Sequence, residues 1–215
     1  MTVADNPGRA RILDRIRAGL RAPGSESIGP SHESLIFEPV TDPFKRFQQE
    51  AAANLIECLL TVDPAGSARQ LAEVLESLPQ GEIFVQDDPS LRRSVEACRI
   101  TRPVRWSSQG GPKEASQATI TLVEALIAQT GSILVTAACG GRGASVVAPC
   151  HIALATRDQL VPDLKTALGD ASRRGVLEKN SFACVISGSS RTADIEKILV
   201  QGAHGPRRLV VIVEG

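Results

Sequence analysis

The chain has 215 residues, of which 42% are hydrophobic, and its 24 basic side chains balance its 24 acidic ones. A chain of this length buries about 70% of the surface that it exposes when unfolded, so it needs no disulfide or metal to hold a core. The zero net charge and the low aromatic content of 3% argue against a general nucleic-acid binder, which has a basic excess and aromatic stacking platforms. Length and composition indicate one globular domain with an appendage, or two small domains.

The cysteines form no C-x-x-C pair. They stand at five separate positions, Cys58, Cys98, Cys139, Cys150 and Cys184. Zinc ribbons and iron–sulfur clusters are usually held by paired cysteine motifs, so neither is indicated, and we expect no metal ligands. Buried thiols in a reducing compartment are the favoured interpretation. No stretch resembles a signal peptide or a membrane helix, so we expect a cytoplasmic protein without membrane insertion.

The N-terminal part differs in composition from the rest. Residues 7–20 have an apolar stripe and many arginines, which predicts an amphipathic helix, and residues 21–43 are rich in Pro, Gly and Ser. We therefore expect residues 1–40 to form a helical arm and linker that docks on its own domain or on a second subunit. Residues 41–215 are expected to form the main domain.

Helices and strands alternate through the main domain. A helix opened by Asp42-Pro43 is predicted to run to about Leu60, because an Asp cap and a proline in the first turn suit a helix start. Further helices are predicted at 67–78, 89–98 and 157–168, and strands at 82–86, 104–107, 118–122, 132–136 and 150–154. This alternation predicts an α/β fold with an open, parallel-rich sheet flanked by helices.

The last third of the chain suggests a βαβ unit. An apolar segment at 182–186 leads into a turn of small residues at 187–190, and a second apolar run follows at 209–213. Between them, Ile195, Ile198 and Leu199 have the spacing of one helix face. A strand, a helix and a strand within about 30 residues predict two parallel strands buried on both faces.

The turn at 187–190 is the first candidate site. Turns that follow strands of open parallel sheets lie at the carboxyl ends of the strands, where ligands usually bind. Gly188 lets backbone N–H groups approach a ligand, and the guanidinium of Arg191 suits a carboxylate or phosphate. His204 would lie at the opposite end of the sheet, so sharing a site with Arg191 requires a long loop or two subunits. Purely structural roles stay open, with Ser190 as a helix cap and Asp194 complementing the helix dipole.

A glycine-rich segment at 139–144 has two readings. It matches neither the dinucleotide fingerprint nor a P-loop, because no Lys-Ser/Thr follows and the next element is a strand. A flexible turn is one reading. A ligand loop whose charge is Arg142 is the other.

Three segments resemble a known family. Residues 187–196, read with the Gly-x-His-Gly-Pro of 202–206, resemble the C-terminal signature of the lactate-utilisation protein C family, also called the LUD domain family. Residues 128–131 resemble a segment that usually reads Ala-Glu-Thr-Gly or Ala-Asp-Thr-Gly, but Gln129 replaces the acidic residue. Arg142, Pro149 and His151 match an Arg-to-Pro-x-His pattern. The resemblance spans about residues 40–215 and is strongest from 128 onward.

The resemblance implies a fold and a role. The fold is that of sugar-phosphate isomerases and coenzyme A transferases. The role is that of a component in the oxidation of L-lactate to pyruvate, with iron–sulfur and cysteine-rich partner proteins that hold the clusters while this chain binds no cofactor. Candidate catalytic residues are His204 and His151. The residues expected to bind a small carboxylate or phosphate are Gly188, Ser189, Ser190, Arg191, Thr192, Asp194, Arg142, Thr130 and Gly131.

Two other functions stay open. The chain could be a stand-alone isomerase-like or transferase-like enzyme acting on a phosphorylated or carboxylated metabolite, although fold analogy is a weak warrant for this. It could also be a non-catalytic assembly or regulatory module, which Gln129 slightly favours. Self-association into a homo-oligomer is a further open alternative.

Overall fold

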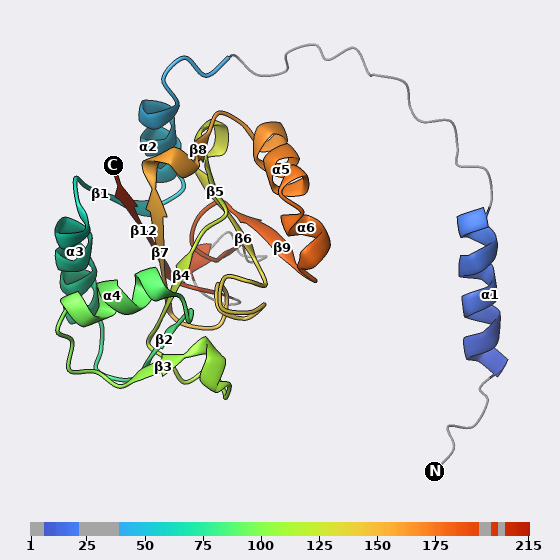
Figure 1. The fold of residues 1–215 in the computed structure, drawn as a ribbon, viewed down its shortest axis with the longest axis horizontal. Coiled ribbons are helices and arrows are strands. Elements are labelled where there is room, and N and C mark those ends of the chain that lie inside the picture. Colours follow the sequence, from blue (N-terminus) through green and yellow to red (C-terminus); the bar gives the residue numbers. More distant parts are fainter. Residues whose placement is uncertain (1–6, 22–38, 194–198, 202–204) are drawn as a thin grey trace. The chain divides into compact units, whose positions relative to one another are not determined.

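The computed structural model describes residues 7–21, 39–193, 199–201 and 205–215 (Figure 1). The chain divides into two compact units, residues 1–39 and 40–215. The first contains α1 (Pro7–Arg21), as the sequence predicts. Among the described residues, no helix has both the length and the apolar character needed to span a bilayer.

A six-stranded sheet forms the centre of the second unit. Its strand order is β1-β12-β7-β4-β2-β3, and every neighbouring pair is parallel. The strands are β1 (Ile56–Thr61), β2 (Ile83–Val85), β3 (Val104–Trp106), β4 (Ala118–Leu122), β7 (Cys150–Thr156) and β12 (Arg208–Glu214). The predicted fold class, an open parallel-rich sheet flanked by helices, is confirmed.

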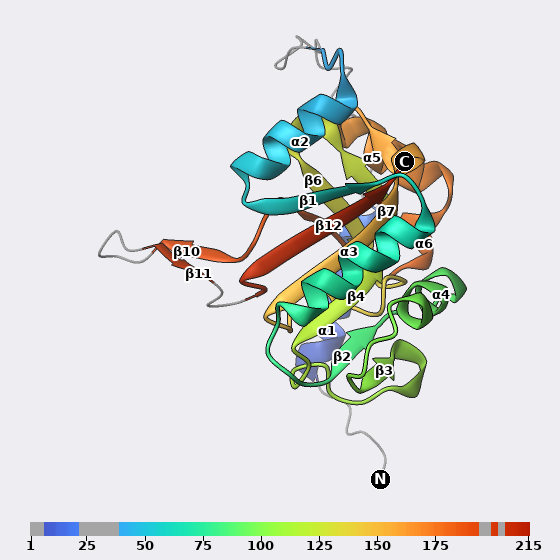
Figure 2. The same ribbon diagram turned by 90° about the vertical axis from the view of Figure 1, so that its left-hand side faces the viewer.

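Two helices cover one face of this sheet, α3 (Pro64–Glu76) and α4 (Pro89–Ala97) (Figures 1 and 2). Each begins at an Asp-Pro pair, in which the carboxylates of Asp63 and Asp88 accept hydrogen bonds from the backbone of the first turn. Apolar side chains of both helices pack on the sheet. The largest fully buried side chains of this layer are Leu71, Leu75 and Leu91 of the helices and Ile83, Ile120 and Ile152 of the sheet.

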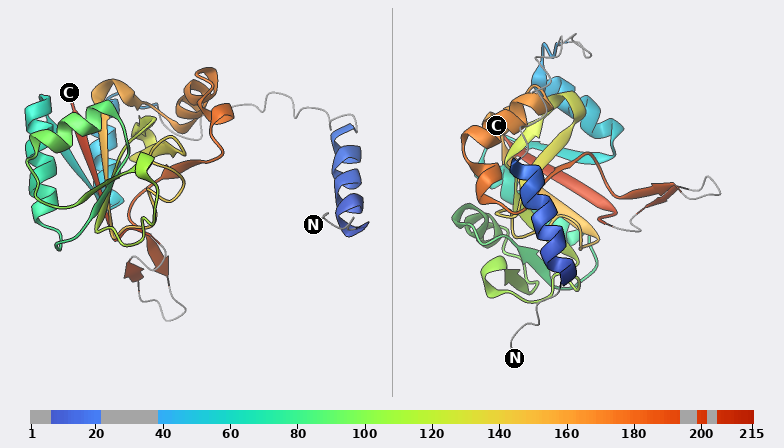
Figure 3. Two further views of the ribbon diagram at one scale, coloured as in Figure 1. Left: turned by 60° about the horizontal axis from the view of Figure 1, so that its bottom comes forward. Right: turned by 90° about the vertical axis from the view of Figure 1, so that its right-hand side faces the viewer.

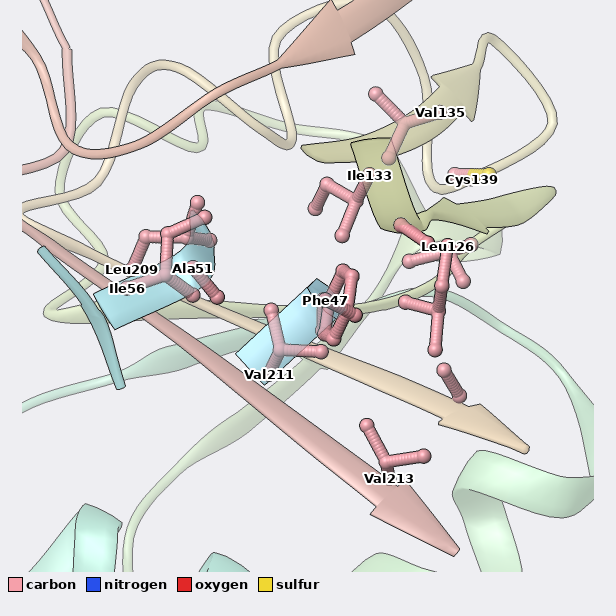
Figure 4. Close-up of a cluster of buried hydrophobic side chains, with 14 residues drawn as sticks. Phe47, Ala51, Ile56, Leu126, Ile133, Val135, Cys139, Leu209, Val211 and Val213 are labelled. Atoms are coloured by element: carbon pink, nitrogen blue, oxygen red, sulfur yellow. The ribbon is translucent and has the colours of Figure 1, made fainter. Parts of the chain in front are cut away.

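A helix and a second sheet cover the other face. The helix is α2 (Pro43–Ala53). The second sheet has the order β8-β5-β6-β9, with β8 (Leu160–Val161), β5 (Ala125–Ile127), β6 (Ser132–Thr136) and β9 (Ala183–Ile186). Helices α5 (Leu164–Arg173) and α6 (Val176–Lys179) follow β8. Phe47 of α2 lies among side chains of both sheets, including Val211 of β12 and Ile133 of β6 (Figure 4).

Two predicted helices are shorter than expected. The helix predicted from Pro43 to Leu60 ends at Ala53, and the following apolar run is β1, an edge strand whose Ile56 pairs with Leu209 of β12. The helix predicted at 157–168 is a 3-10 turn (Arg157–Gln159), then β8, then α5. Short apolar runs do not distinguish helix from strand, and here the partner strands decide.

The βαβ prediction for the last third is wrong. β9 and β12 belong to different sheets, and β9 pairs antiparallel with β6. The predicted helix is replaced at both ends by strands, β10 (Arg191–Ala193) and β11 (Leu199–Gln201), which pair antiparallel. Three apolar residues at helical spacing are a weak signal, and cross-strand hydrogen bonds outweigh it. The strands β10 and β11 project from the body of the domain (Figures 2 and 3). Ile195, Ile198 and Gly202 lie outside the described residues.

Candidate functional site

Hydroxyl groups from two segments meet at one corner of the domain. The turn at residues 187–190, here called the serine turn, follows β9, which pairs with β6, so it lies beside the residue that opens β6. The Ser132 hydroxyl donates to Thr130 Oγ1 at 2.8 Å, and the Oγ atoms of Ser132 and Ser187 are 2.6 Å apart. Because a hydroxyl has one proton, Ser187 donates to Ser132. The predicted residue Thr130 and the serine turn are therefore brought together through Ser132, which the sequence analysis did not select.

A glycine fixes this corner against α2. Gly131 has a φ of +58°, and a Cβ there would lie 2.2 Å from the backbone nitrogen of Ala51 and 2.4 Å from the carbonyl carbon of Glu50. Only glycine combines this conformation with so close an approach. The Asn54 side chain donates to the Thr130 carbonyl at 2.9 Å. Thr130 is thereby held close to the residues that precede β1.

The serine turn lies at the edge where β7 and β12 begin, here called the amino edge. The backbone N–H of Ser190 donates to the Pro206 carbonyl at 2.8 Å, just before β12. The N–H of Arg207 donates to the Pro149 carbonyl at 2.8 Å, just before β7. The prediction of a carboxyl-end turn is wrong, because β9 belongs to the second sheet. Gly188 has a φ of +119°, so glycine is required there.

His151 lies on β7, on the face of the six-stranded sheet that the second sheet covers. It is 1% exposed, and its Nε2 lies 2.9 Å from Thr121 Oγ1. Burial lowers its pKa to about 4, so the imidazole is neutral at pH 7 and is a weak base there. Among the described residues, the buried polar atoms without a hydrogen-bond partner include His151 Nδ1, Thr119 Oγ1 and Ser189 Oγ. Thr119 is the register partner of His151.

The structure does not bring Arg142 to the serine turn. Its Nε donates to Ser181 Oγ at 3.3 Å. Ser181 precedes β9 and the serine turn follows it, so the length of that strand, about 13 Å for four residues, separates them. The glycine-rich segment instead approaches Lys113, because a Cβ on Gly141 would lie 2.7 Å from the lysine Nζ.

Four predicted residues are only partly placed or not placed. The backbones of Arg191 and Thr192 form part of β10, and their side chains are not described. Asp194 and His204 lie outside the described residues.

The cysteine thiols are held in their protonated form. Burial raises the pKa of Cys58 and Cys98 to about 11 and that of Cys150 to about 12. The thiolate is the form that binds metals and attacks electrophiles, so these thiols are inert at pH 7. Among the residues that the structure places, no group of three or more His, Cys, Asp or Glu side chains could hold a metal ion.

Comparison with known proteins identifies relatives. The LUD domain family matches residues 113–213. A protein of Halalkalibacterium halodurans named lactate utilization protein C is 31% identical, over 98% of this chain and 94% of that protein. The protein of the same name from Bacillus subtilis is 27% identical, over 72% of this chain and 71% of its own length. The Deinococcus radiodurans protein is 36% identical, but the match spans about half of its length (48%).

A solved structure shares the fold. The crystal structure of a DUF162 family protein from Deinococcus radiodurans superposes with a TM-score of 0.63 and covers 80% of this chain and 96% of its own. The sequence identity is 22%, so this likeness concerns the fold alone.

Proposed function

Because the chain belongs to the LUD domain family that includes lactate utilization protein C, we propose that it is a component of an L-lactate utilisation system. In this proposal it works in the oxidation of L-lactate to pyruvate beside iron–sulfur and cysteine-rich partner proteins. The observation that carries the proposal is the similarity to the Halalkalibacterium halodurans protein, which extends over 98% of this chain.

The chemistry divides the work between this chain and its partners. Conversion of lactate to pyruvate breaks the hydroxyl O–H bond and the adjacent C–H bond, and releases two protons and two electrons. The electrons need an acceptor. The described cysteines whose pKa burial raises are protonated at neutral pH. We therefore assign the acceptor to the partner proteins and the binding and orientation of lactate to this chain.

The amino edge supplies the groups for a small carboxylate. The hydroxyl chain from Ser187 through Ser132 leaves the Thr130 proton available to donate onward. The serine turn adds backbone N–H groups around Gly188. Arg191 opens β10 directly after this turn and would provide the charge that pairs with the carboxylate.

The roles of the two histidines differ in this proposal. His151 is neutral and buried, so it would act as a hydrogen-bonding group toward the ligand or the turn rather than as a base at pH 7. We assign the base that takes the lactate hydroxyl proton to His204, which comes three residues after the end of β11 in the sequence.

A binding measurement tests the site. We expect L-lactate to bind the isolated chain in isothermal titration calorimetry, and Arg191→Ala to weaken binding at least tenfold without changing the urea midpoint of unfolding. Arg93→Ala, on the exposed side of α4, is the matched control and should bind as the wild type does. An Arg191→Ala variant that binds lactate normally would show that the anion site is wrongly assigned.

The same measurement addresses the alternatives. Tight binding of a sugar phosphate or a coenzyme A ester in place of lactate would favour a stand-alone isomerase-like or transferase-like enzyme. Binding of a partner protein with no small ligand would favour an assembly module. Gln129 fits an assembly module, because its side chain is uncharged at the position where the family usually has an acidic residue.

A further inference from the structure

A cavity of 130 Å³ lies at the opposite edge of the six-stranded sheet from the serine turn. It opens at the carboxyl ends of β4, β7 and β12, between the first turns of α3 and α4. β7 has seven residues, so about 20 Å of strand separates this cavity from the amino edge. It is therefore a separate place on the molecule, and the lactate proposal does not use it.

The topology favours a ligand here. The connection after β2 leads outward to β3, whereas the connection after β4 leads in the other direction to β7. In open parallel sheets, ligands bind outside the carboxyl ends of the strands at such a reversal. The cavity is lined by Leu122 at the end of β4 and by Ser90 on the helix that follows β2.

Most side chains of the polar wall offer hydrogen-bond acceptors. Glu214 contributes a carboxylate, whose Oε2 lies 3.0 Å from the hydroxyl of Ser67, a residue that is only 4% exposed. The hydroxyl protons of Ser90 and Ser94 are already donated, to the Asp88 carboxylate and to the Ser90 carbonyl. Their oxygens retain lone pairs that can accept further hydrogen bonds. Ligand groups that donate hydrogen bonds therefore fit this wall.

The rest of the lining restricts the ligand further. The amide of Gln159 is oriented by the backbone, because its Nε2 donates to the Val123 carbonyl at 2.7 Å and its Oε1 accepts from the Thr156 N–H at 2.9 Å. One N–H of this amide is left for a ligand. No Lys or Arg is among the residues that line the cavity. The carboxylate of Glu214 would repel an anionic ligand bound next to it. The apolar floor, formed in part by Leu154 and Ile212, suits the carbon skeleton of a ligand.

The volume sets the size of the ligand. Pockets for drug-sized ligands usually measure about 300–1,000 Å³, and a water molecule takes about 30 Å³ of liquid. A cavity of 130 Å³ therefore suits a small metabolite.

We propose that this cavity is a second binding site, which takes a small, uncharged, polyhydroxylated molecule. Hydroxyl groups of the ligand donate to Glu214 and to the oxygens of Ser90 and Ser94. Its carbons lie against the apolar floor. Ser67 holds the Glu214 carboxylate in place.

A matched pair of probes tests the ligand class. Erythritol and erythronate have the same carbon chain, but erythronate carries a carboxylate in place of one CH₂OH group. In saturation-transfer NMR at pH 7.5 on the full chain, we expect erythritol to bind and erythronate to bind at least tenfold more weakly. Absence of erythritol binding, or equal binding of the two probes by the wild-type protein, would overturn the proposal.

Variants test the place of binding. Glu214→Gln keeps an acceptor for Ser67 but removes the charge, so we expect weaker erythritol binding and a smaller difference between the probes. Glu73→Gln, on the exposed side of α3, should change neither. Arg191→Ala should keep erythritol binding, which separates this site from the lactate site. Unchanged discrimination in Glu214→Gln would place the binding elsewhere.

Discussion

The hydroxyl oxygens of Ser132 and Ser187 lie 2.6 Å apart and join the start of β6 to the serine turn. Because both hydroxyls are part of one hydrogen-bonded chain with Thr130, their contributions to stability should be coupled. We expect a double-mutant cycle of Ser132→Ala and Ser187→Ala, measured by urea unfolding, to give a coupling energy of about 1 kcal/mol.

A second cycle provides the control. Ser181 lies before β9 and contacts Arg142, so Ser181→Ala and Ser132→Ala should be additive within about 0.5 kcal/mol. Additivity in the Ser132–Ser187 cycle as well would show that the two hydroxyls do not interact.

Gly131 should tolerate no side chain. Gly131→Ala places a methyl group 2.2 Å from the Ala51 nitrogen, and the backbone there must move. We expect the free energy of unfolding to fall by about 3 kcal/mol or more, through left-handed strain together with overpacking. Gly175 has a similar backbone conformation, with a φ of +65°, and its nearest contact would be an ordinary 3.6 Å. Gly175→Ala should therefore cost only about 1 kcal/mol, and equal losses in the two variants would contradict the close approach of α2.

His151 should make stability depend on pH. Its pKa is about 4 in the folded protein, below the ordinary value of 6.5, because burial disfavours the charged form. The unfolded chain therefore takes up a proton as the pH falls below 6.5, whereas the folded protein does not until about pH 4. The stabilisation is fully present above pH 6.5 and is lost as the pH falls toward 4, by about 2 to 3 kcal/mol.

Comparison with a variant isolates this effect from other titrating groups. Between pH 8 and 4.5, the free energy of unfolding of the wild type should fall by about 2 kcal/mol more than that of His151→Gln. Parallel pH curves for the two proteins would mean that His151 titrates normally in the folded state.

Arg102 should stabilise the C-terminal end of α3. The residue is 8% exposed, and its guanidinium donates to the carbonyls of Leu75 at 2.6 Å, Leu78 at 2.7 Å and Pro79 at 2.5 Å. Arg102→Met leaves these acceptors without the charged donor, and we expect a loss of about 3 kcal/mol in unfolding free energy. The exposed Arg93 offers the comparison, since Arg93→Met should change stability by less than about 0.5 kcal/mol.

Two Asp-Pro pairs correctly predicted helix starts, but the helix predicted from 67 begins at Pro64, after a third such pair, Asp63-Pro64. The pairs Asp42-Pro43 and Asp88-Pro89 begin α2 and α4 because the cap and the first-turn proline act within one helical turn. The strand β1 was predicted as part of a helix, because nothing within its short apolar run distinguishes a strand from a helix. The residue that pairs with Ile56 is Leu209 of β12, which is far away in the sequence. The antiparallel pairing of β10 and β11 was missed for the same reason: pairing between strands is not encoded in either segment alone.

The candidate site was predictable in part. The resemblance selected Thr130 and the serine turn, and the structure places both at one corner. The link between them, Ser132, could have been noted as a third hydroxyl residue directly after Thr130-Gly131. The edge of the sheet on which they lie could not be read from the sequence, because it depends on β9 joining β6 rather than β12.

The most direct test of the proposed role is lactate-dependent reduction of an electron acceptor by the reconstituted system of this chain with its iron–sulfur and cysteine-rich partners. We predict that omitting this chain abolishes turnover and that adding it back restores turnover in proportion to its concentration. Unchanged turnover without the chain would contradict its role in lactate oxidation.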